Sequence, residues 1–400
     1  MHTITIVGAS VAGIRSAEAL RSAGYDGRLV LVGDDPHRPY DRPPLSKAFL
    51  AGDLDAEAIG LLDAEEEAGL ALEMRLGVAA ARLDPAGGRV VLADGGDVAT
   101  DGVVVATGGR ARRLPGTEGV EGVHTLRTLD DALALGAALR AGSPRVAIVG
   151  GGFIGAEVAS TCRSMGLEVT VLDGLPLPLA PVLGPRIARS CVDLHAGHGT
   201  DLRPGAAVAG LATVPAREAR GRRVVGVELG DGTTVPADVV VVGIGIVPNT
   251  EWLEGSGLRI ANGVRTDAGM VTDLPNVVAV GDVARYGDGD AGRRHEHWTS
   301  AGEQAAVAAA NLLADAGRPG ATFRPSGYVW SEQYGRMLQL AGHPSAADHV
   351  DVVDGEPADG RFVARYVDGE GVTTGVFGMG NPRVFGRVRR SELGRPARAA

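Results

Sequence analysis

The sequence predicts an α/β protein with two domains of similar build and a smaller α+β domain at the C-terminus. Two observations support this prediction. A strand–glycine turn–helix–strand pattern occurs twice, in residues 3–35 and 145–173, and shorter alternating segments replace the helical period after residue 317. The 400 residues are enough for two or three domains, each with its own hydrophobic core.

The first pattern begins with a short β-branched strand at residues 3–7. The turn GASVAG, an alanine-rich helix and a second strand at residues 29–32 follow. In the turn, Gly8 permits a sharp bend, Ser10 takes the middle position and Gly13 lets the helix lie close to the strand.

The helix after this turn would offer free N–H groups and a partial positive charge to a pyrophosphate. Asp34 and Asp35 end the second strand, about 26 residues beyond Gly8, where an acid accepts hydrogen bonds from ribose hydroxyls. The pattern is therefore that of a Rossmann-like dinucleotide-binding unit. A strand–turn–helix with a purely structural role is the alternative.

The second pattern matches a dinucleotide-binding turn more closely. A strand at residues 145–149 runs into GGGFIG, a helix is expected at residues 156–165, and Asp173 ends the next strand. The three glycine positions are held by Gly150, Gly152 and Gly155. A carboxylate at Asp173 would bond the 2′-hydroxyl of NADH and repel the extra phosphate of NADPH, which favours NADH. A residue that only caps the strand end is the alternative for Asp173.

Three further apolar runs end in glycine, as expected of buried strands whose carboxyl ends pass beneath a cofactor. They are residues 102–106 before Thr107 and Gly108, residues 237–242 before Gly243 and Gly245, and residues 277–280 before Gly281 and Asp282. Asp282 could accept a hydrogen bond from a ribityl hydroxyl, and a simple turn aspartate is the alternative.

A helix is expected from Ala301 to Leu313, with Thr299 and Ser300 as its N-cap. Its N-terminus would suit the partly negative edge of a ring. Beyond Pro319, shorter alternating segments predict a small, sheet-rich third domain. These segments are residues 328–330, 337–341, 362–366 and 372–377.

Composition limits the classes of function. The net charge of −10 argues against binding nucleic acid or an anionic membrane through bulk electrostatics, and no apolar run reaches the roughly 18 residues of a membrane span. The chain enters a strand pattern at Thr3 instead of a signal peptide, so we expect a cytoplasmic protein. Cys162 and Cys191 are the only cysteines, which excludes a disulfide scaffold, a CxxC redox pair and a protein-held iron–sulfur cluster. His295 and His297 have no further ligand at metal spacing, and we expect no metal site.

Lys47 is unusual because it is the single lysine among the 39 basic residues. The chain is rich in arginine, and a single lysine could survive in it by chance.

Further motifs carry a family resemblance over essentially the whole chain. They are PYDRPPLSK (residues 39–47), VVVATG (103–108), VAVGDVA (278–284), the E-x-W element (296–298), WSEQY (330–334) and LQLAG (338–342). With the two glycine turns, they resemble the FAD-dependent, NADH-dependent ferredoxin reductases of bacterial oxygenase systems. PYDRPPLSK is the most specific of them, because enzymes with two dinucleotides and dithiol chemistry carry a cysteine in that region.

The resemblance implies three domains: a discontinuous FAD-binding domain (residues 1–113 and 239–317), an NADH-binding domain (114–238) and a C-terminal interface domain (318–400). It implies FAD and NADH as cofactors. The implied cofactor-binding residues are Gly8, Ser10, Gly13, Asp34, Asp35, Arg42, Lys47, Thr107, Gly108, Gly150, Gly152, Gly155, Asp173, Gly245, Gly281, Asp282, Trp298 and Trp330.

The resemblance also implies three catalytic residues, Lys47, Glu157 and Trp298. Lys47 would lie beside the flavin, where the bulky planar fork of an arginine could not replace a compact ammonium against a ring edge, and chance survival is the alternative for it. It would pair with Glu157 in the first turn of the NADH-site helix. An ordinary first-turn acid stabilised by the helix dipole is the alternative for Glu157. Trp298 and Trp330 would contact the isoalloxazine or its surroundings, and core packing is the alternative for both.

Without a cysteine pair to receive electrons, the implied acceptor is a small 2Fe–2S ferredoxin. It would feed an oxygenase, either a haem-thiolate cytochrome monooxygenase or a ring-hydroxylating dioxygenase. Docking an acidic ferredoxin on a protein of net charge −10 would need a local basic patch. The candidates for this patch are Arg112, Arg113, Arg293, Arg294, Arg383, Arg387, Arg389 and Arg390. A rubredoxin reductase, an NADH oxidase or peroxidase-type flavoenzyme and a non-enzymatic redox sensor remain alternatives. A monomer and a weak dimer are both open.

Overall fold

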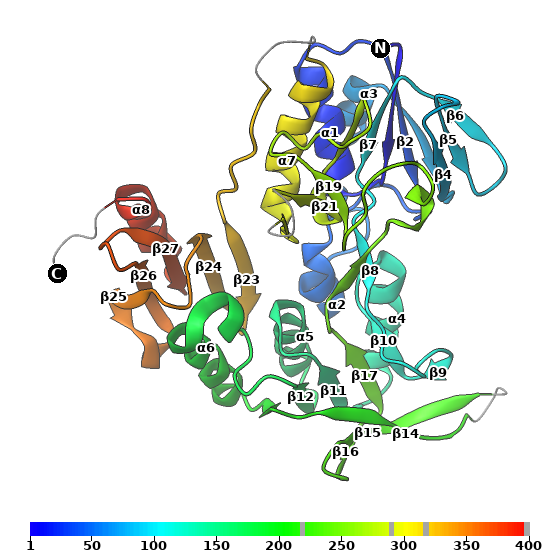
Figure 1. Ribbon diagram of the computed structural model, residues 1–400. Helices are drawn as coiled ribbons and strands as arrows, with labels where there is room; N and C mark the ends of the chain where they lie inside the picture. The colour runs from blue at the N-terminus through cyan, green and yellow to red at the C-terminus, as the bar shows by residue number, and fades with distance from the viewer. Residues whose placement is uncertain (217–220, 288–291, 315–319, 396–400) are drawn as a thin grey trace. The chain divides into compact units, whose positions relative to one another are not determined.

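The computed structural model describes residues 1–216, 221–287, 292–314 and 320–395, and it divides into two compact units (Figure 1). Unit 1 comprises Met1–Asp41, Ala56–Arg110 and Ile246–Pro325. Unit 2 comprises Arg42–Asp55, Ala111–Gly245 and Ser326–Ala400. The domain boundary expected between residues 317 and 318 falls outside the described residues.

Unit 1 is built on a five-stranded sheet in the order β20-β7-β1-β2-β3, and every pairing in it is parallel. The strands are β1 (Thr3–Val7), β2 (Arg28–Gly33), β3 (Leu72–Leu76), β7 (Gly102–Val105) and β20 (Val277–Ala279). The three central strands, β7, β1 and β2, are buried along almost their whole length, which is the pattern of a parallel sheet covered on both faces.

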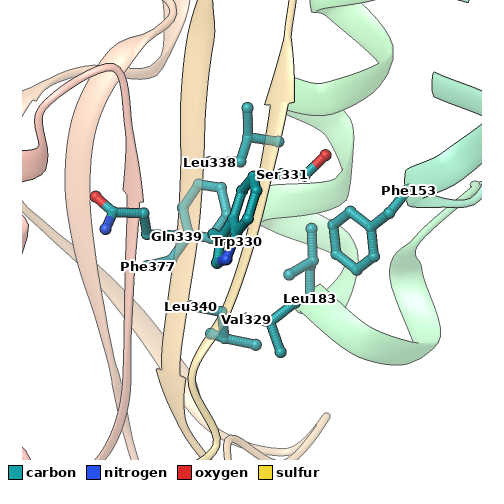
Figure 2. Close-up of a pocket in the computed structure, with 9 residues that line it drawn as sticks. All are labelled: Phe153, Leu183, Val329, Trp330, Ser331, Leu338, Gln339, Leu340 and Phe377. Atoms are coloured by element: carbon teal, nitrogen blue, oxygen red, sulfur yellow. The ribbon is translucent and has the colours of Figure 1, made fainter. Parts of the chain in front are cut away.

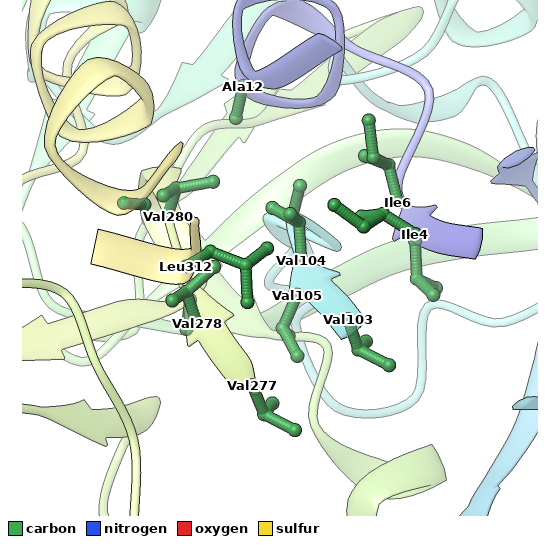
Figure 3. Close-up of a cluster of buried hydrophobic side chains, with 14 of the residues drawn as sticks. Ile4, Ile6, Ala12, Val103, Val104, Val105, Val277, Val278, Val280 and Leu312 are labelled. Atoms are coloured by element: carbon green, nitrogen blue, oxygen red, sulfur yellow. The ribbon is translucent and has the colours of Figure 1, made fainter. Parts of the chain in front are cut away.

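Helices α1 (Val11–Ser22) and α7 (Trp298–Leu312) pack against each other. Their side chains join those of the sheet in one buried cluster, in which Figure 3 shows Ile4, Ile6 and Leu312. Burial of each such side chain contributes about 1.5–3 kcal/mol. The N-cap predicted at Thr299 and Ser300 is wrong, because α7 begins at Trp298 and both residues lie in its first turn.

Smaller elements complete unit 1. A capping box formed by Asp63 and Glu66 begins helix α3. The smaller elements include α3 (Ala64–Leu70), the antiparallel strands β4 (Ala80–Asp84), β5 (Arg89–Leu92) and β6 (Asp97–Ala99), and a second small sheet of β19 (Val264–Thr266), β21 (Ala284–Tyr286) and β22 (Arg293–Arg294). Strand β18 (Ile246–Pro248) and the short helices η2 (Glu251–Leu253) and η3 (Gly281–Val283) also belong to unit 1.

Unit 2 contains a second five-stranded parallel sheet, in the order β10-β17-β11-β12-β13. Its strands are β10 (Val123–Thr125), β11 (Val146–Val149), β12 (Val169–Asp173), β13 (Asp201–Pro204) and β17 (Val239–Val242). β17 pairs in parallel with β11, so residues 239–242 lie in this sheet, one strand beyond the boundary expected at residue 238.

The same part of unit 2 carries three longer helices, two short ones and a β-ribbon. The helices are η1 (Pro43–Ser46), α2 (Ala48–Ala51), α4 (Leu129–Arg140), α5 (Phe153–Ser164) and α6 (Ala180–Gly197). The ribbon is formed by β14 (Val208–Pro215), β15 (Arg222–Leu229) and β16 (Thr234–Pro236). Pro43 and Pro44 occupy the first positions of η1, where proline's missing N–H would have no partner.

The C-terminal part of unit 2 is an antiparallel sheet in the order β23-β24-β27-β26-β25. The strands are β23 (Val329–Gln333), β24 (Arg336–Gly342), β25 (His349–Glu356), β26 (Arg361–Val367) and β27 (Thr373–Met379). Helix α8 (Pro382–Glu392) packs on the sheet through Phe385 and Val388, which confirms the α+β prediction for this region. In the part of the chain that the structure describes, no helix combines the length and apolarity that a membrane crossing needs.

Candidate functional site

The first glycine turn joins the carboxyl ends of three neighbouring strands. The N–H of Gly8 donates to the Val32 carbonyl (2.7 Å), and a Cβ on Gly8 would lie 2.1 Å from the Ala106 carbonyl oxygen. A Cβ on Gly13 would lie 1.9 Å from the carbonyl oxygen of Gly8. Ser10 is the N-cap of α1 and makes no side-chain cap bond. The first turn of α1 thus has neither a side-chain cap from Ser10 nor an acidic residue of its own, as suits an anion site.

The two acids after β2 differ in their surroundings. Asp34 is exposed, whereas the Asp35 carboxylate accepts hydrogen bonds from the Tyr40 hydroxyl (2.7 Å) and the His37 N–H (3.1 Å). Tyr40 lies in the PYDRPPLSK segment, so this segment orients one of the two predicted ribose-binding acids.

Two further turns of unit 1 are fixed by residues that no sequence motif indicated. Asn249 holds the Thr107–Gly108 turn: its side chain donates to the Thr107 carbonyl (3.0 Å), and the Thr107 hydroxyl donates to the Asn249 carbonyl (2.8 Å). Gly281 has a φ of 74°, and its N–H donates to the side-chain oxygen of Gln304 (2.6 Å). Gln304 is fully buried in α7, and its amide nitrogen has no partner among the described residues.

Arg294 supports the turn that contains Asp282. Its guanidinium donates to the Asp282 carbonyl (3.0 Å) and forms an ion pair with Glu296 (2.8 Å), and only 10% of its side chain is exposed. Arg294 therefore serves this turn and is not available as a surface charge for docking, contrary to the expectation from the sequence. Arg293 is exposed.

Trp298 is held at the start of α7 by a polar contact. Its indole N–H donates to the Asp41 carboxylate (2.7 Å), and the Arg15 guanidinium lies 5.7 Å from its ring centroid. The residue is 38% exposed, which argues against core packing as its role. Asp41 belongs to the PYDRPPLSK segment, so this segment also orients Trp298.

In the second glycine turn, the backbone leaves no room for a side chain at two of the glycines but leaves open space at a third. A Cβ on Gly150 would lie 2.3 Å from the Gly243 carbonyl oxygen, and a Cβ on Gly155 would lie 2.0 Å from that of Gly150. A Cβ on Gly152 would meet nothing within 4 Å, and the same holds for the exposed Gly245. The missing side chain of Gly152 therefore serves no packing need of the fold, which fits the close approach of a ligand.

Asp173 lies against this turn. One of its carboxylate oxygens accepts the N–H of Gly151 (2.6 Å), and the other accepts the N–H of Leu175 (2.7 Å). The carboxylate is thus held beside the glycine turn, where the sequence placed a ribose-binding acid.

Lys47 and Glu157 form a partly buried ion pair within unit 2. The Lys47 Nζ lies 2.7 Å from the Glu157 Oε2, and their side chains are only 16% and 7% exposed. Lys47 also donates to the Pro43 carbonyl (3.0 Å), and its ammonium lies 5.1 Å from the ring centroid of Trp330. The pair itself is as expected. The placement of Glu157 in the first turn is wrong, because α5 begins at Phe153 and Glu157 is its fifth residue.

Hydroxyl groups from two segments support Glu157. Ser46 donates to the carboxylate oxygen Oε2 (2.6 Å), and Ser331 donates to Oε1 (2.7 Å). One helical turn after Glu157, the Thr161 hydroxyl donates to the Ser46 carbonyl (2.8 Å). None of these three residues is predicted from the sequence, although Ser46 lies in PYDRPPLSK and Ser331 lies in WSEQY.

Trp330 also lines an apolar pocket of unit 2 (Figure 2). Phe153, which directly follows Gly152, contributes to this pocket from α5, and Leu183 contributes from α6. Trp330 therefore has the Lys47 ammonium over its ring and shares a pocket with Phe153, the first residue of α5.

Neither cysteine is suited to redox chemistry. Cys162 and Cys191 are both buried and free, and burial raises the pKa of each thiol to about 12. A thiol with such a pKa stays protonated at neutral pH and is a poor nucleophile.

Comparison with known proteins shows the family to which the chain belongs. Residues 2–305 match the pyridine nucleotide-disulphide oxidoreductase family, and residues 328–394 match the reductase C-terminal family. The chain belongs to the pyridine nucleotide-disulphide oxidoreductases. Similar proteins within this family include the rhodocoxin reductase of Rhodococcus erythropolis, which is 38% identical over 90% of this chain and 82% of that protein. The ferredoxin–NAD(+) reductase component of the anthranilate 1,2-dioxygenase system of Burkholderia cepacia is also 38% identical, over 96% and 92% of the two chains.

A similar solved structure is the covalent putidaredoxin reductase–putidaredoxin complex. It is 34% identical, has a TM-score of 0.87, and covers 97% of this chain and 92% of the matched chain. Membership of the pyridine nucleotide-disulphide oxidoreductases makes the chain an oxidoreductase that uses FAD and NAD(H). The residues fit both cofactors. Unit 1 has an uncapped glycine turn and a buried amide nitrogen with no partner among the residues that the structure describes, and unit 2 has open space at Gly152 beside a held carboxylate.

Proposed function

We propose that this protein passes electrons from NADH through FAD to a small 2Fe–2S ferredoxin that supplies an oxygenase. One NADH gives up a hydride and two ferredoxins each take one electron, which leaves NAD⁺ and one proton. The observation that carries the proposal is the similarity, over 96% of the chain, to the ferredoxin–NAD(+) reductase component of a dioxygenase system. The buried, protonated thiols support it as well, because no cysteine of the chain is placed to take the electrons.

We propose that unit 1 binds FAD, that residues 111–245 bind NADH and that residues 326–395 form the interface domain. When bound, FAD supplies the change from two-electron to one-electron transfer. The turn at Gly8–Gly13, Thr107–Gly108, Gly245, and Gly281–Asp282 would hold it, with Asp34 and Asp35 on its ribose. The turn with Gly150, Gly152 and Gly155 would hold the pyrophosphate of NADH, and Asp173 would select NADH over NADPH by repelling an added phosphate.

Lys47 is proposed to stabilise the negative charge that develops on the flavin during reduction. Its ammonium is largely withdrawn from water, so its field is weakly screened. The pair with Glu157 fixes its position, and Trp330 covers it from one side. Arg42 and Trp298 are proposed to contact the same cofactor. The N-terminus of α7 would add a partial positive charge.

The proposed docking surface for ferredoxin is a stripe of exposed arginines on α8. Arg383, Arg387 and Arg390 are exposed, and their spacing of four and three residues places them on one face of the helix. The single acid of α8, Glu392, is paired with Arg365 (2.9 Å) and does not offset the stripe. Such a surface suits a partner with acidic side chains around its cluster.

A cytoplasmic location is also proposed. Both thiols are free, as is usual in a reducing compartment.

The test of this function uses the purified protein loaded with FAD. NADH, a 2Fe–2S ferredoxin and cytochrome c are added, and cytochrome c reduction is followed. We expect fast reduction only with ferredoxin present and slow NADH oxidation without it. Fast oxygen consumption without a carrier would instead identify an NADH oxidase. Faster turnover with rubredoxin than with any member of a ferredoxin panel would identify a rubredoxin reductase.

A further inference from the structure

We infer that Ser331 and Gln333 of strand β23 are positioning residues for the Lys47–Glu157 pair. This inference rests on the proposed function, because it assigns their effect to electron entry into the flavin. It would give the C-terminal domain a part in the NADH half-reaction in addition to its proposed part in docking.

The hydrogen-bond directions around Glu157 carry the inference. Its Oε2 accepts from Lys47 (2.7 Å) and Ser46 (2.6 Å), and its Oε1 accepts from Ser331 (2.7 Å). A carboxylate with donors on both oxygens has a fixed plane. The Ser331 hydroxyl therefore determines which way Oε2 faces Lys47.

Gln333 fixes the direction of the Ser331 hydroxyl. The Gln333 amide nitrogen donates to the Ser331 oxygen (3.1 Å), so the hydroxyl proton cannot point back and remains available to Glu157. Ser331 and Gln333 are both fully buried and stand two residues apart on β23, so their side chains leave the same face of the strand.

The strand is held in this register at its end. The N–H of Tyr334 donates to the Ser160 hydroxyl of α5 (2.7 Å), and the Tyr334 hydroxyl is bonded to Thr200 (2.8 Å). Glu157 and Ser160 lie on the same helix, so α5 binds β23 both at Ser331 and just beyond its last residue. The positions of the pair and of β23 are thereby coupled.

Loss of the Ser331 hydroxyl would leave a buried carboxylate oxygen without a donor, so Glu157 and its ammonium partner would adopt other orientations. Losing a hydrogen bond to a charged group would change a rate constant that depends on this bond by about tenfold. We therefore expect Ser331→Ala to slow flavin reduction by NADH about tenfold and to make the flavin midpoint potential more negative. Ser331→Thr, which keeps the hydroxyl, should restore most of both properties. Gln333→Leu should give a smaller change in the same direction.

The experiment measures flavin reduction by stopped flow and the midpoint potential by titration of the FAD-loaded protein. The same substitutions are then made in the Glu157→Gln variant, and both measurements are repeated. If Ser331 acts through Glu157, Ser331→Ala has little further effect once Glu157 is replaced. Equal slowing in both backgrounds, or wild-type values for Ser331→Ala, would overturn the inference.

Ser345→Ala removes an exposed hydroxyl of the same domain and is the matched control. Thermal unfolding of every variant identifies any that fail to fold, and Ser331→Thr and Gln333→Leu then carry the test. No ferredoxin enters these measurements. A wild type that reduces its flavin but not ferredoxin would therefore contradict the proposed function and leave this inference standing.

Discussion

At the scale of single residues, Lys47 carries the most specific prediction. Lys47→Met removes the ammonium and leaves the Glu157 carboxyl group only 7% exposed, with two hydroxyl donors and no cationic partner. We expect flavin reduction by NADH to slow at least tenfold. The free energy of unfolding should fall by about 3 kcal/mol, the lower part of the range for a broken buried ion pair, because the hydroxyls remain. Stopped flow and denaturant unfolding measure the two effects.

A second substitution separates stability from electron transfer at this pair. In the double variant Lys47→Met with Glu157→Gln, no uncompensated charge is buried, so part of the lost stability should return. Flavin reduction should stay slow, because the ammonium is still missing. If the double variant is no more stable than Lys47→Met alone, burial of an unpaired carboxylate is not the cause of the loss.

At the scale of elements, the glycine turn before α5 allows ligand binding and folding to be separated. Gly152→Ala places a methyl group in open space at a φ of −71°, which any residue adopts. The fold should tolerate it, while the KM for NADH should rise about tenfold as the backbone is held off the pyrophosphate. Gly155→Ala drives a Cβ to 2.0 Å from the Gly150 carbonyl oxygen and should lower the unfolding temperature. An unchanged KM for Gly152→Ala would show that no ligand lies against this turn.

The end of α6 carries a pH prediction. His195 is buried, its Nδ1 is bonded to the Tyr334 hydroxyl (2.8 Å), and burial, with a smaller contribution from His198, lowers its pKa to about 4. In the unfolded chain this histidine titrates near pH 6.5, so the unfolded state binds more protons between these two values. Stability should therefore fall as the pH drops from about 6.5 towards 4, by up to about 3 kcal/mol from this group.

The check on this prediction is the pH dependence of denaturant unfolding in His195→Gln. The slope between about pH 4 and 6.5 should be flatter than in the wild type, because the difference in proton binding is gone. His349→Gln is the control, since 74% of that histidine's side chain is exposed. A slope in His195→Gln equal to that of the wild type would exclude His195 as its source.

The elements that the sequence predicted are those with a local pattern. Both βαβ units follow from apolar strands and from glycines such as Gly8 and Gly150, whose positive φ is a property of the local chain. Elements outside these two units, such as strand β25 and helix α8, were not predicted. In α8, only Phe385 and Val388 are buried among many arginines, so its apolar face is hard to recognise in the sequence. The start of α5 was placed three residues late, because a glycine N-cap at residue 152 carries no side-chain cap pattern.

The residues of the candidate site also differ in whether the sequence indicates them. Lys47 could be found because it is the only lysine and lies in a family motif, and Glu157 could be found because the family resemblance implies an acid at that position. Ser331 could not, since its bond to Glu157 joins residues 174 positions apart and leaves no trace in either segment. Gln304 was missed for the same reason, because its amide holds Gly281 across two elements.

At the scale of the whole molecule, an acidic protein must attract an acidic partner through a local surface. The chain has a net charge of −10, so the long-range field repels a ferredoxin, and only short-range contacts with the α8 arginines would favour it. The double variant Arg387→Gln with Arg390→Gln should raise the KM for ferredoxin about tenfold at low ionic strength. In the wild type, that KM should rise with salt, because counterions screen the stripe.

A matched variant separates the local stripe from the overall field. Arg112→Gln with Arg113→Gln removes two exposed charges as well, so both double variants reach the same net charge of −12, since −10 less two cations is −12. Because the overall charge changes equally in both variants, a larger rise in the KM for ferredoxin in the α8 variant would assign docking to that helix. Steady-state cytochrome c reduction over a ferredoxin and salt series measures it, with flavin reduction by NADH as the internal reference. Equal effects of the two variants would mean that the overall field governs the encounter, and a larger effect at Arg112 and Arg113 would move the docking surface there.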